Sequence, residues 1–244
     1  MGFLNNPFID QVEYRRQLEA ACPGDPELLR AWLEGDWAVA RGAYFASVLD
    51  EQRNAITPWD KIPTHHHLPW ERYLAHDFGS SAPSVTYIVA VSPGATVNDQ
   101  YFPSDSLVLV DELASNEPGR LNKGLGWTVP KLADAIKEMC DRWEVDAYGV
   151  PDDAIFAQAR HSHGSISGWA TMPRLLQDAG KPDVPGLSVA RHCAYFWATV
   201  PYLARDRRRV EDVDPRGPDH VVHVVRYGCL RWHSDPTVVR ISGI

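Results

Sequence analysis

Apolar residues in the central part of the chain run together in short stretches, a spacing that is typical of β-strands. The stretch Arg72–Gly79 has an apolar strand start from Tyr73 to Ala75, and it places Asp77 near the strand end, before a Gly-Ser-Ser turn. Val85–Val91 follows at hairpin distance and is apolar at most positions. We therefore predict two paired strands, with a carboxylate at the end of the first.

Two further strands and a helix follow. Leu107–Leu113 is a short apolar run of the kind found in a central strand. Thr128 and Pro130 open a helix in which apolar residues recur every three or four positions as far as Trp143. Val145–Val150 predicts a fourth strand. This order indicates an α/β fold with an antiparallel meander, a crossover and a parallel strand, and we expect the Asp77 strand in the middle of the sheet.

The flanking parts of the chain have mostly helical spacing. Before the strands we expect helices at 9–22 and 25–35, irregular chain, and a proline-rich loop at 55–71. After the strands we expect a weak helix from 154, a helix at about 169–179, a strand at 187–190, a helical stretch at 193–203, a charged loop at 206–218 and a last helix at 219–227. The predicted organisation is a helical appendage at 1–50, one domain at 51–234 and a tail at 235–244.

Charge and composition narrow the class of protein. The chain has 24 Lys and Arg against 32 Asp and Glu, a formal net charge of −8, which argues against a broadly basic nucleic-acid surface. A local basic strip is present, and its members are candidate phosphate contacts, with a solvated loop as the alternative. These residues are Arg205, Arg207, Arg208 and Arg209.

The cellular setting follows from what the sequence lacks. Its 4 cysteines are scattered and form no CxxC pair, so they indicate neither a zinc site nor a disulfide framework. The sequence shows no run of about 18 apolar residues and no signal-peptide pattern at its N-terminus. We therefore expect a reducing cytoplasm and no membrane partner.

Carboxylates and histidines fall where α/β sheets carry their sites. Asp77 and Asp152 each lie at the C-terminal end of a predicted strand, and the two strands are expected to be neighbours. Asp219, His220 and His223 lie on the first turns of the last helix. Two strand-end carboxylates and a helix-borne ligand suit two divalent cations about 3.5–4 Å apart, an arrangement that stabilises phosphodiester displacement. The alternatives are a turn-capping role for Asp77 and an N-cap role for Asp219.

Five stretches, taken together and in order, resemble the C-terminal half of tailed-bacteriophage terminase large subunits. They are Leu33–Trp37, Ala75–Ser80, Gly149–Phe156, Ser167–Trp169 and Glu211–Tyr227. The resemblance implies an RNase H-like nuclease domain, a mixed β-sheet flanked by helices, that cuts concatemeric double-stranded viral DNA with two Mg²⁺ or Mn²⁺ ions. It also implies a terminase ATPase domain, the small terminase subunit and the portal as partners, in a bacterial host cell.

The resemblance assigns roles to single residues. Asp77 matches the first catalytic aspartate, Asp152 the second, and His220 the histidine of the last helix. The third aspartate of the family falls on His223, whose imidazole accepts Mn²⁺ but suits Mg²⁺ poorly. Asp219 is the nearest replacement, one helical turn before. Further candidates are Asp153, Asp212 and Asp214.

The sequence differs from the terminase pattern in two further respects, and it is compatible with three functions. Residues 155–168 form a shorter segment than the family usually has there, so we expect an edge element to be missing. The sequence has no GxxxxGK[ST] phosphate loop, so we interpret the chain as an excised domain or a truncated prophage gene. It is either an active endonuclease, a non-catalytic remnant that serves as a binding or structural module, or an unrelated metallohydrolase that uses His65–His67. The last of these lacks a spaced zinc motif, and its three consecutive histidines also fit an exposed loop.

Overall fold

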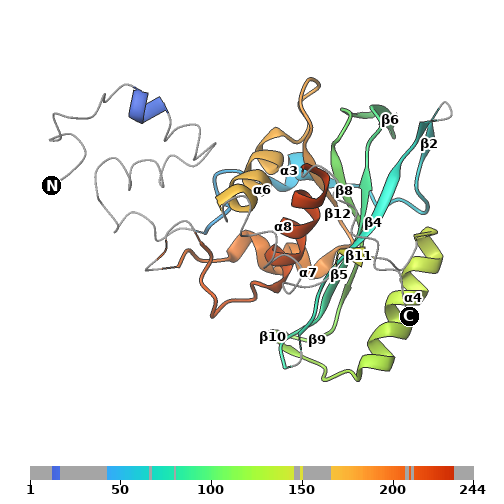
Figure 1. The fold of residues 1–244 in the computed structure, drawn as a ribbon, viewed down its shortest axis with the longest axis vertical. Coiled ribbons are helices and arrows are strands. Elements are labelled where there is room, and N and C mark those ends of the chain that lie inside the picture. The colour runs from blue at the N-terminus through green and yellow to red at the C-terminus, as the bar shows by residue number, and fades with distance from the viewer. Residues whose placement is uncertain are drawn as a thin grey trace, which may run out of the picture.

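A mixed β-sheet forms the centre of the molecule (Figure 1). The computed structural model describes residues 13–16, 43–65, 68–79, 81–145, 149–150, 166–206, 209 and 212–233. The main sheet has six strands in the order β1-β12-β8-β5-β4-β11. They are β1 (Ala55–Ile56), β12 (Leu187–Ala190), β8 (Leu107–Ala114), β5 (Val85–Val91), β4 (Glu71–Asp77) and β11 (Gly149–Val150).

The strand directions bring several strand ends to one edge. β5 runs antiparallel to both β4 and β8, whereas β11 is parallel to β4, β12 to β8 and β1 to β12. The C-terminal ends of β4, β8, β11 and β12 therefore share one edge of the sheet, as the predicted meander and crossover require. β4 lies between β5 and β11 as predicted. It is not in the middle of the sheet, however, because β12 and β1 extend the sheet on the far side of β8.

Helices cover both faces of this sheet (Figure 1). One face carries α4 (Val129–Trp143), and the other carries α6 (Ile166–Asp178), α7 (Ala194–Thr199) and α8 (His220–His233). β5 is buried at all seven of its positions because it lies under helices on both sides. The predicted α/β class, a mixed sheet flanked by helices, is confirmed.

Short elements occupy the region 55–71, which was expected to be a loop, and two connections between the longer elements. The region 55–71 contains β1, β2 (Thr64–His65) and β3 (Leu68–Pro69), preceded by α3 (Glu51–Asn54). A hairpin of β9 (Asn116–Glu117) and β10 (Arg120–Gly124) precedes α4, and another joins β6 (Ala95–Val97) to β7 (Gln100–Phe102). All of these strands except β10 have two or three residues, which is too short to give a period of two, so the sequence pattern missed them.

Helix boundaries differ in places from the prediction. The last helix continues to His233, beyond the predicted end at Tyr227, and the predicted helical stretch at 193–203 comprises α7 and the 3₁₀ helix η2 (Val200–Tyr202). Of the predicted strand 145–150, the structure assigns Gly149–Val150. The predicted helix from 154 and the tail lie outside the described residues, and so does the N-terminal appendage apart from the helical residues 13–16 and the segment from 43.

The loop after Asp77 follows one tightly packed path. The Ser84 hydroxyl donates to the Gly79 carbonyl at 3.1 Å and accepts from the Gly79 amide at 3.1 Å. The Gly124 amide of β10 donates to the Ser81 carbonyl at 2.9 Å. An added Cβ would lie 2.4 Å from the Ala82 carbonyl oxygen at Gly79, and 2.5 Å from that oxygen at Gly124. The loop therefore requires glycine at both positions.

Gly124→Ala tests this packing. The new methyl group would overlap the Ala82 backbone, so we expect the free energy of unfolding to fall by about 1–3 kcal/mol, the usual cost of overpacking. The measurement is urea denaturation followed by circular dichroism. Gly228→Ala in α8 is the matched control: its Cβ would meet neighbours at an ordinary 3.6 Å. It should leave stability unchanged or raise it by about 0.5–1 kcal/mol, because alanine favours a helix. Equal effects of the two substitutions would contradict the packing.

Candidate functional site

The candidate site begins at the C-terminal end of β4. Asp77 is the last residue of this strand and is 9% exposed, in a setting of buried apolar strand residues. Its side chain lies on the face of the sheet that α8 covers, the same face as Tyr73, whose hydroxyl donates to the Gly228 carbonyl at 2.6 Å. A buried carboxylate needs a polar partner, because an unpaired one is costly to desolvate.

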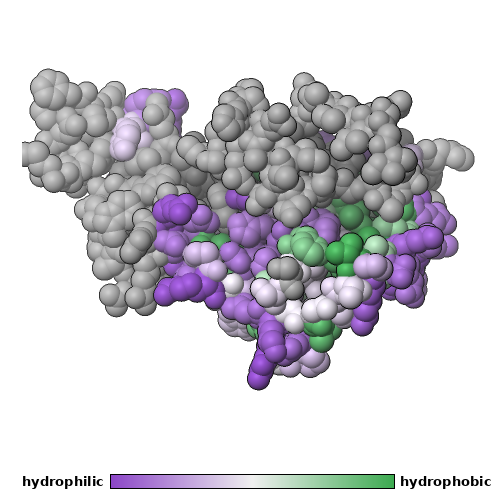
Figure 2. Space-filling view, turned by 60° about the horizontal axis from the view of Figure 1, so that its bottom comes forward, coloured by the Kyte–Doolittle hydropathy of each residue, from purple (hydrophilic) through white to green (hydrophobic). Residues whose placement is uncertain are grey.

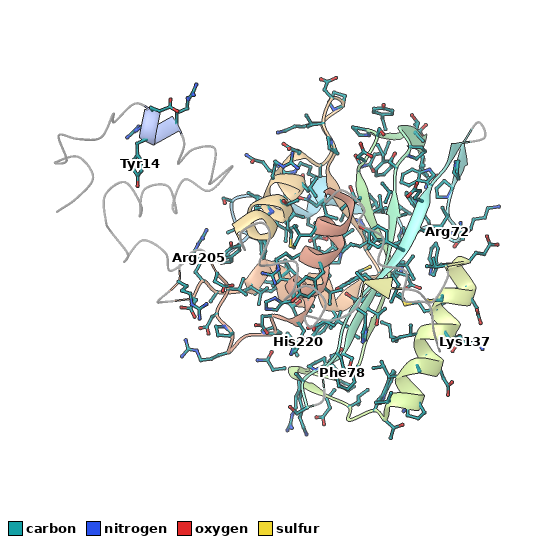
Figure 3. All side chains as sticks on the ribbon, in the orientation of Figure 1. Tyr14, Arg72, Phe78, Lys137, Arg205 and His220 are labelled. Carbon is teal, nitrogen blue, oxygen red and sulfur yellow. The ribbon has the colours of Figure 1, made fainter. Side chains whose placement is uncertain are left out.

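The start of α8 supplies that partner. The backbone amide of His223 donates to the Asp219 carbonyl at 3.2 Å, so the helical bonds begin at Asp219. His220 Nδ1 lies 2.7 Å from Asp77 Oδ2. With Nδ1–H donated to the carboxylate, the imidazole presents Nε2 as an acceptor, the tautomer that a carboxylate partner selects. Figure 3 shows His220 and Phe78, the residue after Asp77, at the same end of the molecule.

A second carboxylate–imidazole pair lies on the same turn of α8. His223 Nε2 is 3.3 Å from Asp219 Oδ2, a contact between residues four apart on one helix face. Both side chains are partly exposed, at 28% for His223 and 15% for Asp219. The carboxylate of Asp219 thus contacts an imidazole, in addition to its place just before the helix. The structure pairs Asp77 with His220 and Asp219 with His223, and the two pairs share neighbouring residues at the start of α8.

The second predicted aspartate is not described. Asp152 and Asp153 lie outside the described residues, two and three positions after the end of β11. The described part of β11 pairs Val150 with Ala75 in parallel register. The two loop candidates have local partners instead. Asp214 forms an ion pair with Arg216 at 2.5 Å, and Asp212 Oδ1 accepts from the Val213 amide at 2.9 Å.

The predicted basic strip is not a continuous surface feature. Arg205 is only 5% exposed, and its guanidinium lies 4.8 Å from the centre of the Tyr44 ring. It packs against the domain interior rather than facing a ligand, which corrects its assignment as a phosphate contact. Arg209 is exposed, and its amide donates to Asp206 at 2.9 Å. Arg207 and Arg208 lie outside the described residues.

Sequence reasoning missed two acids in the second half of β8, of which the first is Asp111. It is 7% exposed and accepts from the Trp143 indole at 2.7 Å, with the Arg142 guanidinium at 3.3 Å. His192 Nε2 lies 3.3 Å from its other oxygen. The sequence feature that could have indicated these acids is the pair of consecutive carboxylates that directly follows the apolar run Leu107–Val110.

Glu112, the second of these acids, points to the opposite face, the one that carries α7 and α8. Its carboxylate accepts from the Tyr195 amide at 2.7 Å, from the Phe196 amide at 2.8 Å and from the Tyr87 hydroxyl. Burial raises the pKa of the Glu112 carboxyl, and these three hydrogen bonds act against the rise. Burial and the charge of Glu112 in turn raise the pKa of Tyr87 well above its ordinary value. Glu112 therefore joins β5, β8 and the start of α7.

The Asp77, Asp219, His220 and His223 side chains are candidate ligands for a divalent ion. Two carboxylates and two imidazoles are ligands that Mn²⁺ accepts, whereas Mg²⁺ prefers oxygen alone. Within the described ranges, no three His, Cys, Asp or Glu side chains are arranged so that they could hold one metal ion. The set fits a divalent ion in chemical type, and a complete ligand group requires a carboxylate from outside the described residues. Figure 2 shows hydrophilic residues around much of the described surface and a group of hydrophobic residues near the middle of the view.

Comparisons with known proteins identify the fold. No family model and no curated protein matches the sequence. The large terminase of a thermophilic bacteriophage, in complex with ADP, superposes with a TM-score of 0.56 at 12% identity, over 89% of this chain and 51% of that chain. Another crystal structure of that terminase gives 0.54 at 12% identity, over 94% and 54% of the two chains. The nuclease domain of the P22 large terminase matches at 0.45 and 14% identity, over 78% and 92%.

The superpositions on the thermophilic-phage terminase confirm, at the level of fold, the resemblance that the sequence indicated. The chain has a terminase-like fold and spans about half the length of that protein. In the part of the chain that the structure describes, no helix combines the length and the apolar character needed to cross a lipid bilayer.

The enclosed carboxyl of Glu112 predicts a pH-dependent stability. Because its pKa is raised in the folded state, the folded protein holds more protons than the unfolded chain between the ordinary and the raised value. The free energy of unfolding of the wild type should therefore fall, relative to Glu112→Gln, as the pH rises through that interval. Urea denaturation from pH 4 to 8 measures this difference.

The control for this titration is Glu138→Gln, which removes an exposed carboxylate from α4 and reports the effect of a lost surface charge. If the wild type instead gains stability relative to Glu112→Gln as the pH rises, the three hydrogen-bond donors outweigh desolvation. That result would contradict the raised pKa of Glu112.

Proposed function

We propose that this domain is a metal-dependent endonuclease that hydrolyses phosphodiester bonds in double-stranded DNA, as part of a terminase that packages a phage genome. The observation that carries the proposal is the contact of Asp77 with His220, which joins the C-terminal end of β4 to the start of α8. The parallel strand β11 ends beside them. A strand-end carboxylate next to a helix-borne polar cluster is a suitable place for phosphodiester chemistry.

The register of β11 supports a role for Asp152. Gly149 pairs with Leu74 and Val150 with Ala75. β11 ends at Val150, two residues before Asp152 in the sequence. We therefore propose Asp77 and Asp152 as the two strand-borne ligands of Mg²⁺ or Mn²⁺, with Asp219 and His223 as ligands from α8. Bound divalent ions would stabilise the charge that develops on the attacking and leaving oxygens.

The protein's own groups prepare this site. The His220 imidazole holds the Asp77 carboxylate by one oxygen and leaves the other available, as an outer partner of a metal-binding carboxylate does. The closed path of the loop after Asp77 keeps the carboxylate at the end of β4.

The proposed partners follow from the same assignment. Double-stranded DNA would be the substrate, and a terminase ATPase domain, the small terminase subunit and the portal would be assembly partners in the cytoplasm of the host bacterium. The thermophilic-phage large terminase is a protein about twice as long as this chain, and its solved structure contains ADP. An ATPase domain would accordingly lie in a portion that this chain does not match.

One observation favours a second function, that of a non-catalytic binding or structural module. Where the terminase pattern has its third aspartate, this chain has His223, and its Nε2 faces the Asp219 carboxylate. An imidazole that contacts Asp219 competes with a metal ion for that oxygen. A domain with this pair intact would keep the fold while it binds metal weakly.

His223→Asp separates the two functions. The wild type should cleave plasmid DNA weakly or not at all with Mg²⁺ and better with Mn²⁺, because Mn²⁺ accepts imidazole. His223→Asp should raise Mg²⁺-dependent cleavage by about 10- to 100-fold, the range seen when a metal-site partner changes. Supercoiled plasmid and agarose gels provide the assay.

Asp77→Asn, alone and combined with His223→Asp, is the control for this experiment. It should reduce cleavage to background in both settings, because it removes a proposed ligand and keeps the shape of the side chain. The nuclease function requires that His223→Asp cleaves DNA with Mg²⁺ and that Asp77→Asn abolishes this cleavage. If either result is not obtained, the domain is a non-catalytic binding or structural module.

Neutralising the remaining basic strip tests the DNA contact. Arg207→Gln, Arg208→Gln and Arg209→Gln together should weaken DNA binding and reduce the slope of log K against log salt by up to roughly 2.7, at about 0.9 for each phosphate contact. Fluorescence anisotropy at several salt concentrations measures the slope. The matched control changes three exposed lysines elsewhere, Lys61, Lys137 and Lys181. Equal slopes for the two triple variants would assign the strip to a solvated loop.

A further inference from the structure

The β9–β10 hairpin contacts three segments that border the candidate site. The Gly124 amide donates to the Ser81 carbonyl in the loop after Asp77. The Asn122 side-chain amide donates to the Arg216 carbonyl at 3.0 Å, in the loop that leads into α8. The Tyr195 hydroxyl of α7 donates to the Leu121 carbonyl. One short hairpin therefore links the segment after Asp77, the segment before Asp219 and the start of α7.

Tyr195 is fixed at both ends. Its backbone amide donates to Glu112 Oε1 at 2.7 Å, which ties the first turn of α7 to β8. Its hydroxyl reaches the hairpin. Burial raises the pKa of Tyr195, and the charges of Glu112 and Asp219 raise it further, so the hydroxyl stays protonated and remains a donor.

Without the contacts that hold the β9–β10 hairpin, the distance between Asp77 and His220 would be less well fixed. The contact of Asp77 with His220 spans 2.7 Å and joins two segments that are 143 residues apart in the sequence. The hairpin contacts the loop after Asp77 through Gly124 and the loop before α8 through Asn122. The separation of these two loops therefore depends on where the hairpin lies, and the Tyr195 hydroxyl ties the hairpin to the rest of the domain.

We propose that Tyr195 is a positioning residue for the candidate site: its hydroxyl holds the β9–β10 hairpin, and the hairpin sets the distance between Asp77 and His220. The catalytic consequence of this role rests on the proposed nuclease function, whereas the structural consequence does not. Tyr195 does not act on the substrate, and its effect passes through Leu121, Asn122 and Gly124. The unit formed by Glu112, Tyr195 and the hairpin joins the sheet to the site.

Tyr195→Phe removes one hydroxyl and keeps the ring, so it tests the role directly. In Mn²⁺-dependent cleavage, kcat should fall about tenfold while KM for DNA stays within about twofold, because displacement of a reacting group affects the chemical step. Independently of cleavage, the ¹⁵N resonance of His220 Nδ1 should shift toward that of an imidazole without a carboxylate partner. His220→Gln identifies this resonance by its loss.

Two further variants keep the proposal falsifiable. Asn122→Ala breaks the exposed contact of the hairpin with Arg216, so it should shift the His220 resonance in the same direction even if Tyr195→Phe fails to fold. Tyr101→Phe, on the distant strand β7, removes a hydroxyl from a 48% exposed tyrosine and should change neither kcat nor the resonance.

The outcomes separate this inference from the proposed function. If the wild type does not cleave DNA, the nuclease function fails, and the His220 resonance alone decides the role of Tyr195. If the wild type cleaves and Tyr195→Phe leaves both kcat and the resonance unchanged, the positioning role is overturned. A change in kcat without a change in the resonance would also overturn it, because the proposed effect passes through the Asp77–His220 distance.

Discussion

The packing of α8 across β4 and β5 sets the geometry of the candidate site and of the sheet face around it. The helix lies against both strands at Gly228, where an added Cβ would make ordinary contacts with Ala75 and Val89 at 3.6 Å. The Tyr73 hydroxyl donates to the Gly228 carbonyl and fixes the helix along the strand. With this crossing fixed, the first turn of α8 reaches the end of β4. The pairing of Asp77 with His220 requires that position.

Two acids in the second half of β8 connect α4 and α7 to the sheet. The Glu112 carboxylate accepts hydrogen bonds from the Tyr195 and Phe196 amides in the first turn of α7. The carboxylate of its neighbour Asp111 accepts one from the Trp143 indole of α4, on the opposite face. Two consecutive residues of one strand thereby fix helices on both sides of the sheet. A buried carboxylate with several donors is tolerated because its partners replace the lost water. The same arrangement makes these positions sensitive to substitution with apolar residues.

The site contains fewer oxygen ligands than a pair of divalent ions prefers. Asp77 and Asp219 each contact an imidazole, and His223 occupies the place of a third aspartate in the resembling family. An imidazole can bind a metal ion or pair with a carboxylate, but its nitrogen does one of these at a time. The balance between metal binding and internal pairing therefore decides between the two proposed functions.

Elements with local signals could be predicted from the sequence, whereas the meeting of distant segments could not. The apolar runs predicted β4, β5 and β8, and the resemblance placed Asp77 and His220 in one site, where the structure brings them to 2.7 Å. The pattern also indicated a strand at 187–190, but not that it joins the sheet beside β8. Arg205 belongs to a basic run in the sequence, yet its guanidinium donates to the Tyr44 carbonyl, 161 residues earlier. Such contacts arise when elements pack together, and residue spacing along one element carries no record of them.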